Sequence, residues 1–336
     1  MIEDDFTNYS GKGLSGLVNY GNTCYINSAI QSLSHTLDLT DFFRSKKYEK
    51  KIKDKDDNIN TEFVKNWVKL LNGLWEDNCI ISPKSFFKNL IQICNEKGIN
   101  LGFSVNMQND IQEFLMVVLE IFHDCFSEKK KFKSLRKLEG LNKESEKSWS
   151  DFYENDYSKI IELFYGQILT VISDKETGKV YSNNFQPICF VPLPINNKED
   201  CSIYDCIDLY LEKETLESHK INDEGETKDI YKQMKLFRLP KIIIFTINRF
   251  NNNNMKLNNN IEFPEDLDMS KYNNDTNNKY ELYSVCNHYG GSRGGHYTSY
   301  CKNDNKWYEF NDTTVMKMSS VNTSNAYCLF YRRTTK

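Results

Sequence analysis

The chain has 336 residues, a formal net charge of −4, 27% charged residues and 13% aromatic residues. A chain of this length can bury a core without disulfides or metals, and its slight net charge indicates neither a nucleic-acid nor a membrane partner. No stretch reaches the roughly 18 apolar residues of a membrane span. The acidic N-terminus, Met1 to Asp5, is unlike a signal peptide.

The ten cysteines are scattered, and no two of them form a CxxC pair, so zinc-ribbon spacing is absent. Glycosylation sequons at Asn8, Asn274, Asn311 and Asn322 would be liable to modification in a secreted chain. An intracellular, reducing location, cytoplasmic or nuclear, therefore fits better than secretion.

The segment from Gly16 to Ser28 brings Cys24 to the start of a predicted helix, which Asn22 or Thr23 could cap. Apolar residues then recur at helical spacing: Ile26, Ile30, Leu33 and Leu37. Backbone N–H groups and the dipole at a helix start favour a thiolate over a thiol. This position suits a nucleophile, but many single cysteines are simply small buried hydrophobes, so it does not decide between the two.

The rest of the N-terminal half predicts helices joined by charged connections. Residues 1–13 are polar and predict a flexible tail, and residues 46–60, rich in lysine and aspartate, predict a solvated connection. Residues 127–158 are charged and irregular and predict a solvated insertion. Apolar residues at helical spacing predict three further helices, over 61–75, 83–95 and about 107–126. Ser82 is the expected cap of the second of these, with Pro83 in its first turn.

Two acidic residues, Asp110 and Glu113, lie three apart at the start of the last of these helices and share one face. Complementation of the helix dipole alone would account for them. A ligand for this pair is therefore a hypothesis that needs independent support.

From Leu163 onward the apolar period changes to two, which predicts strands. A short helix over 203–213 and a polar excursion over 219–228 interrupt them. The predicted strands are 164–172, 185–195, 241–250, 280–288, 296–302, 306–310 and 326–333. Helices first and an antiparallel sheet second is the order of an α+β fold.

A glycine-rich stretch, residues 290–295, predicts a mobile loop directly before His296. An imidazole at such a place suits the base of cysteine chemistry. Folding the following hairpin about Asp304 brings Asn311 and Asp312 back beside His296. Either side chain could accept a hydrogen bond from the imidazole, and the turn register decides which one does.

Three motifs, in this order, resemble the catalytic domain of the ubiquitin-specific proteases, and the resemblance covers about Leu14 to the C-terminus. The first is similar to the family's cysteine box, the second to its next signature, and the third to its histidine box. The cysteine box corresponds to Gly16 to Ser28 with Gln31, and the histidine box to Tyr283 to Tyr300 with Trp307 to Asp312. The signature between them corresponds to Gln108 to Leu115. There the family usually has Gln at the position of Asn109 and Ala at the position of Ile111.

The resemblance implies one papain-like α+β catalytic domain over residues 14–336, acting as a monomer that hydrolyses the bond after the C-terminal glycine of ubiquitin. Its expected parts are a helical thumb, an antiparallel palm and a fingers sheet that shares strands with the palm. Their expected limits are about 14–158 for the thumb, 159–238 for the fingers and 239–336 for the palm.

By the same resemblance, Cys24 would attack the carbonyl, and His296 would take its proton and later activate water. Asn311 would orient the imidazole, Asp312 would be an auxiliary polar residue, and Asn19 would donate its amide to the oxyanion beside the Cys24 N–H group.

The resemblance also implies a site for the ubiquitin tail. Asp110 and Glu113 would pair with an arginine of that tail. The stretch 290–295 resembles a loop that shifts when the tail enters. The residues expected to line the tail are Asp110, Glu113, Gln108, Tyr297 and Gly295.

One departure concerns zinc, which most relatives bind through two CxxC pairs at the fingertips. Here Ile172 to Glu176 stands in place of the first pair, and the second is missing around residues 219–232. We therefore expect neither zinc nor any other cofactor, and a fingers sheet held by strand pairing. Two alternative functions stay open: a catalytically silent ubiquitin-binding scaffold, and a peptidase for a ubiquitin-like modifier.

Overall fold

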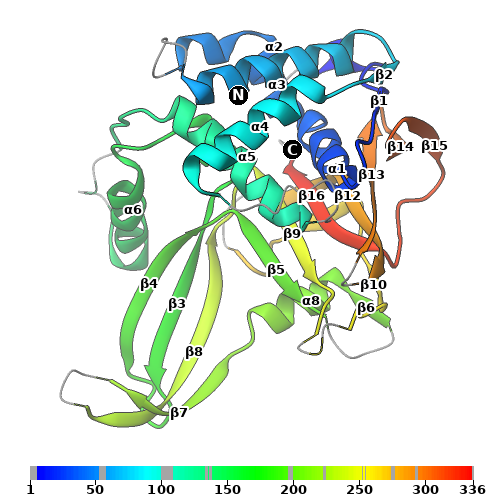
Figure 1. The fold of residues 1–336 in the computed structure, drawn as a ribbon. Coiled ribbons are helices and arrows are strands. Elements are labelled where there is room, and N and C mark those ends of the chain that lie inside the picture. Colours follow the sequence, from blue (N-terminus) through cyan, green and yellow to red (C-terminus); the bar gives the residue numbers. More distant parts are fainter. Residues whose placement is uncertain are drawn as a thin grey trace.

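The computed structural model describes residues 6–52, 58–99, 109–132, 135, 138–195, 200–221, 225–251, 253, 255–273, 277–291 and 294–334. Helices fill the N-terminal part, and two sheets follow (Figure 1). This order confirms the predicted α+β class. No helix in the described part of the chain is long and apolar enough to cross a membrane.

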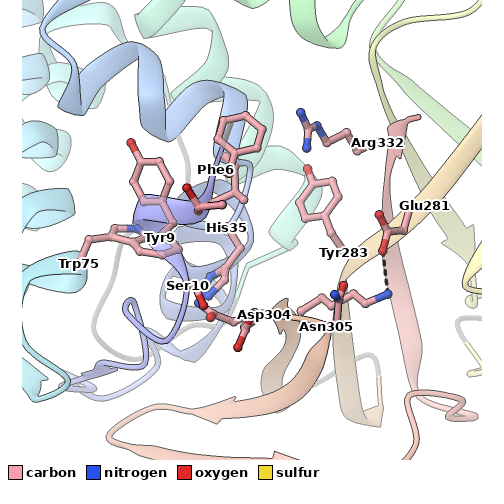
Figure 2. Close-up of a pocket in the computed structure, with 14 residues that line it drawn as sticks. Phe6, Tyr9, Ser10, His35, Trp75, Glu281, Tyr283, Asp304, Asn305 and Arg332 are labelled. Carbon is pink, nitrogen blue, oxygen red and sulfur yellow. Dashed lines mark hydrogen bonds and ion pairs between the residues drawn. The ribbon is translucent and has the colours of Figure 1, made fainter. Parts of the chain in front are cut away.

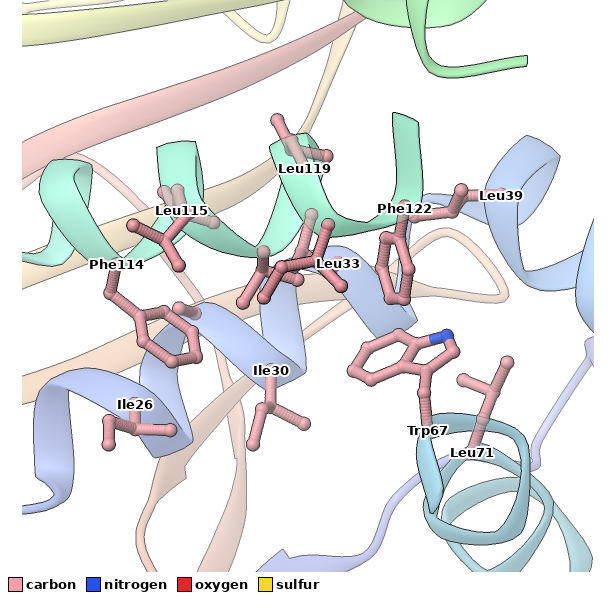
Figure 3. Close-up of a cluster of buried hydrophobic side chains, with 14 of the residues drawn as sticks. Ile26, Ile30, Leu33, Leu39, Trp67, Leu71, Phe114, Leu115, Leu119 and Phe122 are labelled. Atoms are coloured by element: carbon pink, nitrogen blue, oxygen red, sulfur yellow. The ribbon is translucent and has the colours of Figure 1, made fainter. Parts of the chain in front are cut away.

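The N-terminal helices pack together as the region that we call the thumb. Figure 3 shows apolar side chains of α1 facing those of α3 and α5, including Ile30, Trp67 and Phe122, all of which are fully buried. The helices are α1 (Cys24–Ser34), α2 (Leu37–Arg44), α3 (Ile59–Glu76), α4 (Lys84–Lys97) and α5 (Ile111–Phe126). Short 3₁₀ turns at Thr7–Tyr9 and Lys47–Lys50 and the parallel pair β1 (Gly16–Leu17) and β2 (Ile80–Ile81) complete it.

An eight-stranded sheet, the palm, packs against the thumb and runs in the order β15-β14-β13-β12-β16-β9-β5, with β11 also on β12. All pairs are antiparallel except β5 with β9. The strands are β5 (Phe190–Pro194), β9 (Ile242–Asn248), β11 (Asp266–Asp268), β12 (Lys279–Gly291), β13 (Gly294–Asn303), β14 (Lys306–Asn311), β15 (Thr314–Met318) and β16 (Ala326–Arg333).

The apolar run in β9 is explained by its place in the middle of the palm. Ile242 and Ile244 pack into the core shared with the thumb. Ile243 and Phe245, which point the other way, pack into a second core. Helix α8 (Ile203–Tyr210) and the parallel pair β6 (Asp200–Ser202) and β10 (Asn260–Glu262) lie on that second side.

A second antiparallel sheet, the fingers, projects away from the thumb in the order β4-β3-β8-β7 (Figure 1). Helix α6 (Gly140–Tyr153) packs against β4 of this sheet, and helix α7 (Lys159–Phe164) packs against α5 and β9. Its strands are β3 (Gly166–Asp174), β4 (Val180–Ile188), β7 (Glu214–Lys220) and β8 (Thr227–Arg238).

Several strand predictions were wrong in extent. The strand expected over 185–195 breaks at Cys189 into β4 and β5, which belong to different sheets. The excursion expected over 219–228 includes the ends of the paired strands β7 and β8. Strand β15 was not predicted. Strands β7 and β15 are mostly solvent-exposed, so their sequences carry little apolar alternation.

The solvated insertion expected over 127–158 contains helix α6, which packs against the fingers. Trp149 and Tyr153 are buried with Ile161 in a small apolar cluster. The Arg238 guanidinium lies 4.7 Å from the Trp149 ring centre. Because the other faces of α6 are charged, the buried side chains were too few to reveal a helix in the sequence.

The described part of the expected tail, residues 6–13, packs against the domain. Tyr9 is buried and meets the Trp75 ring edge-on with centroids 5.1 Å apart. Asn303, at the end of β13, accepts a hydrogen bond from the Gly11 N–H at 3.1 Å and donates to the Lys12 carbonyl at 2.5 Å. Figure 2 shows this segment as one wall of a pocket of about 620 Å³.

The turn between β3 and β4 is organised by Asp174. Its carboxylate accepts hydrogen bonds from the Thr177 N–H at 2.7 Å, the Glu176 N–H at 3.0 Å and the Tyr181 hydroxyl at 2.5 Å. The Lys228 ammonium on β8 lies 3.6 Å away. The hydrogen bonds from Tyr181, Thr177 and Glu176 hold the pKa of Asp174 well below its usual range, the Tyr181 bond contributing most. The described residues contain no group of three His, Cys, Asp or Glu side chains that could hold a metal ion.

We therefore predict that Asp174→Ala loosens the fingertip and that a chelator does not. Amide hydrogen exchange in β3 and β4 should become about tenfold faster in the variant, because three hydrogen bonds to the carboxylate are lost. Since the native pKa is depressed, this stabilisation is complete at neutral pH and disappears as the pH falls.

The matched control is Asp229→Ala on β8, whose carboxylate accepts longer hydrogen bonds, from the Ser218 N–H at 3.2 Å and from Lys175 at 3.4 Å. It should change exchange less. Faster exchange in wild type after treatment with a chelator would contradict the prediction.

Candidate active site

Cys24 is the first residue of α1, and its side chain is only 2% exposed. Thr23 occupies the N-cap position, but its side chain makes no capping hydrogen bond. Instead, the Asn19 side-chain oxygen accepts hydrogen bonds from the Thr23 N–H at 3.2 Å and the Thr23 hydroxyl at 3.0 Å. Asn19 therefore fixes the turn that leads into Cys24.

His296 lies near the start of β13, on the hairpin predicted from the sequence. The turn is the two residues Asp304 and Asn305, both with positive φ angles of 51° and 56°. This is the turn chemistry of a tight hairpin. It sets the register in which Ser299 pairs with Phe310 and brings Asn311 back toward His296.

The imidazole of His296 interacts with both Asn311 and Cys24. Its Nε2 donates to the Asn311 Oδ1 at 2.7 Å, which leaves Nδ1 for the Cys24 sulfur. The open choice between Asn311 and Asp312 is thus decided for Asn311. The pKa of His296 is raised to about 9, first by its hydrogen bond to Cys24 and then by Asn311 and the nearby charges, against the effect of burial. The protonated imidazole is therefore stabilised beside the sulfur.

Asp312 follows directly, in a left-handed backbone conformation with φ of 49°. Its Oδ2 accepts from the Asn19 Nδ2 at 2.9 Å, and its Oδ1 accepts from the Asn27 Nδ2 at 2.8 Å. Its backbone carbonyl accepts from the Leu17 N–H at 2.7 Å. One residue thus joins the end of β14 to β1 and α1.

Gly16 makes this junction possible. A Cβ atom at this position would lie 2.3 Å from the carbonyl oxygen of Thr313, which is backbone and cannot move aside. Any other residue would push the Asp312 turn away from β1.

Asn27 was quoted within the cysteine motif but given no role by sequence reasoning. It lies three residues after Cys24, on the same helix face, and is 3% exposed. A signal was present in the sequence: Asn27 and Gln31 form a polar stripe in an otherwise largely apolar helix. The Gln31 Nε2 donates to the Ser15 carbonyl at 2.8 Å, so this stripe faces the chain before Cys24.

The residues expected at the ubiquitin tail are only partly brought together. Asp110 is the N-cap of α5, accepting from the Gln112 N–H at 2.6 Å, and it also accepts from the Tyr327 hydroxyl. Asp110 thus has a structural role as the cap of α5, which requires no ligand. Glu113, in the first turn of α5, is exposed. Gln108 lies outside the described residues.

Tyr297 and Gly295 belong to the start of β13, beside the other aromatic groups of this region. The Tyr297 ring lies 6.1 Å from that of Tyr327 and 6.5 Å from that of Tyr25, between centroids. A Cβ atom on Gly295 would lie 2.1 Å from the Tyr289 carbonyl oxygen. The described glycines of the expected mobile loop pair as strand: Gly290 with Gly295 and Gly291 with Gly294.

Together these groups can perform acyl transfer. A sulfur nucleophile touches an imidazole, an amide orients that imidazole, and a second amide lies at the start of the nucleophile's helix. This is the arrangement that covalent catalysis by cysteine requires.

Comparison with known proteins agrees with this geometry. The family described as ubiquitin carboxyl-terminal hydrolase matches residues 15–331. Ubiquitin carboxyl-terminal hydrolase Usp2 of Drosophila melanogaster is 33% identical over 96% of this chain and 35% of its own length. Ubiquitin carboxyl-terminal hydrolase 2 of Homo sapiens is 32% identical over 98% of this chain and 56% of its own. The chain thus spans between a third and three fifths of these relatives.

Among solved structures, a chain of the SAGA Ubp8/Sgf11/Sus1/Sgf73 DUB module bound to ubiquitin aldehyde is similar, with a TM-score of 0.75 and 25% identity. The match covers 97% of this chain and 71% of that one. The expected papain-like fold of the ubiquitin-specific proteases is thereby confirmed. The chain belongs to the ubiquitin carboxyl-terminal hydrolase family.

Proposed function

We propose that this chain is a cysteine peptidase that hydrolyses the peptide or isopeptide bond after the C-terminal glycine of ubiquitin. The observation that carries the proposal is His296, whose imidazole is hydrogen-bonded to Cys24 on one side and to Asn311 at 2.7 Å on the other. A protein that only bound ubiquitin would have no use for a protonated imidazole held beside a sulfur.

The reaction proceeds in two halves. The Cys24 thiolate attacks the carbonyl carbon, and the tetrahedral intermediate collapses as His296 gives its proton to the leaving amine. The products of this half are a thioester on Cys24 and the free amine. Neutral His296 then takes a proton from water, the hydroxide attacks the thioester, and the ubiquitin carboxylate leaves with the thiolate restored. Asn311 holds the imidazole in one tautomer throughout.

Asn19 is the proposed donor to the oxyanion, together with the Cys24 N–H group. An amide nitrogen carries two hydrogens, and Asp312 takes one of those on Asn19. The other can point toward the developing negative charge. Removing a donor of this kind lowers kcat by about 100- to 1000-fold in other enzymes.

The remaining features of the proposal concern surroundings and partners. The chain would act as a monomer inside the cell, with ubiquitin and ubiquitinated proteins as partners. None of the ten cysteines forms a disulfide, which supports a reducing location. No metal is proposed, because Asp174 organises the fingertip where relatives carry a zinc pair.

The first prediction concerns covalent capture. Ubiquitin with a cysteine-reactive group at its C-terminus should form a one-to-one adduct with the wild type and none with Cys24→Ala, as measured by mass spectrometry. Cys24→Ala should still bind ubiquitin, because the sulfur contributes little to the interface.

An adduct on Cys24→Ala would refute the assigned nucleophile. Binding without an adduct on the wild type would favour a silent scaffold. The wild type could also neither bind ubiquitin nor form the adduct, yet react with a probe built on a ubiquitin-like modifier. That result would change the substrate class.

The second prediction concerns pH. Because protonated His296 supplies the proton to the leaving amine, kcat/KM should fall as the pH rises through about 9, the raised pKa of His296. The Asn311 hydrogen bond is one of the causes that raise this pKa. Asn311→Ala should therefore move the basic limb to lower pH, and Asn311→Asp, which keeps an acceptor, should not. An unmoved limb in Asn311→Ala would contradict the role of Asn311.

The third prediction separates substrate binding from helix capping on α5. Glu113→Lys should raise KM about tenfold with little change in kcat, since a charge-assisted bond to a basic tail residue is lost. Asp110→Asn is the matched variant, because asparagine caps a helix as well as aspartate but carries no charge. It should raise KM without lowering the melting temperature. If both KM values stay unchanged, capping and dipole complementation are the whole explanation.

A further inference from the structure

Asn27 lies one helical turn beyond Cys24 and is buried beneath the junction of thumb and palm. Its Nδ2 donates to the Asp312 Oδ1 at 2.8 Å and approaches the Val18 carbonyl at 3.4 Å. Both contacts are to groups that flank Asn19: Val18 precedes it in the chain, and Asp312 holds its side chain.

The orientation of the Asn27 amide follows from charge. An ionised carboxylate only accepts hydrogen bonds, so the nitrogen of Asn27 and not its oxygen must face Asp312. The Asn27 Oδ1 is buried and has no hydrogen-bond partner in the described structure. A buried unpartnered oxygen is unfavourable, so the contact to Asp312 is what holds this side chain in place.

Asp312 has one carboxylate oxygen for each of two amides. Oδ1 takes the proton of Asn27 and Oδ2 that of Asn19. Without Asn27 the carboxylate is free to rotate about its last bond, and Asn19 loses the fixed partner that aims its second hydrogen. A donor to an oxyanion acts only within about 2.7–3.1 Å of it.

We propose that Asn27 is a positioning residue for the oxyanion donor, acting through Asp312 on Asn19. The inference rests on the proposed peptidase function, because it assigns a role within that reaction. It separates two parts of the site: the Cys24–His296 pair, which makes the nucleophile, and the Asn27–Asp312–Asn19 chain, which stabilises the negative charge that the attack creates.

The test uses two reactions of the same sulfur. Hydrolysis of a ubiquitin C-terminal amide develops an oxyanion, whereas alkylation of Cys24 by iodoacetamide does not. We expect Asn27→Ala to lower kcat for the amide about 10- to 100-fold, less than direct loss of the Asn19 donor, with KM changed less than about twofold. The rate of Cys24 alkylation should change less than about threefold, because the nucleophile is intact.

Ser32→Ala is the matched control on α1. The Ser32 hydroxyl is also buried, and it lies 2.8 Å from the Ser284 hydroxyl, away from Asp312. This variant should lose stability and keep kcat. If it loses kcat as Asn27→Ala does, packing of α1 and not oxyanion positioning explains the effect.

A charge swap gives a second, independent readout. Asn27→Asp alone sets two carboxylates against each other and should lower kcat at least as much as Asn27→Ala. Combined with Asp312→Asn, the amide and the carboxylate exchange places: the new amide donates to residue 27 and accepts from Asn19. If the two substitutions acted independently, their effects on kcat would multiply. The kcat of the double variant should be at least about tenfold higher than that product predicts.

The positioning role of Asn27 can be refuted while the proposed peptidase function stands. If the wild type hydrolyses the ubiquitin amide but kcat of Asn27→Ala is unchanged, the positioning role is overturned and the peptidase stands. Parallel losses of alkylation and hydrolysis would overturn it too, because Asn27 would then act on the Cys24–His296 pair. A wild type that alkylates normally but never hydrolyses any ubiquitin amide refutes the function itself.

Discussion

The carboxylate of Asp312 joins two parts of the chain that the active site needs at one place. It accepts a hydrogen bond from Asn27, 285 residues away in sequence, and another from Asn19. Its backbone adds a third bond, to Leu17. The nucleophile comes from the helical thumb and the imidazole from the palm, so their relation depends on this junction. The close approach of Thr313 to Gly16 leaves no room for a side chain there.

The same junction shapes the electrostatics of the site. His296 is partly buried, which by itself disfavours its charge, yet its pKa is raised to about 9 because Cys24, Asn311 and Asp312 all favour the protonated form. A charge is stable in such a place only when polar partners surround it. The Asp312 carboxylate thus favours the protonated imidazole and also holds the side chain of Asn19, the proposed oxyanion donor.

A carboxylate also organises the far end of the molecule. At the fingertip, in the turn between β3 and β4, Asp174 accepts hydrogen bonds from two backbone N–H groups and a tyrosine hydroxyl, and a lysine lies slightly farther away. Charge-assisted hydrogen bonds to one anion can fix a turn in this way. Similarly, Asn303 uses both ends of its amide to fasten residues 11 and 12 to the hairpin that carries His296.

The sequence by itself determined the chemical groups, their order and the class of fold. Periodicity in α1 and α5 and in the palm strands β12, β13, β14 and β16 was strong because each has a well-defined buried face, and the three motifs identified Cys24, His296 and Asn19. Exposed or partly exposed elements, such as β7, β15 and α6, lacked that signal and were missed or misread.

Only the tertiary structure decided the relations between distant groups. The choice of Asn311 over Asp312 required the register of the β13–β14 turn, because one residue of slip would exchange the two side chains. The role proposed for Asn27 depends on which residues face α1, because the sequence does not show which group an asparagine in a helix will bind. Local patterns determine which face of an element is buried; long-range packing decides which polar groups meet there.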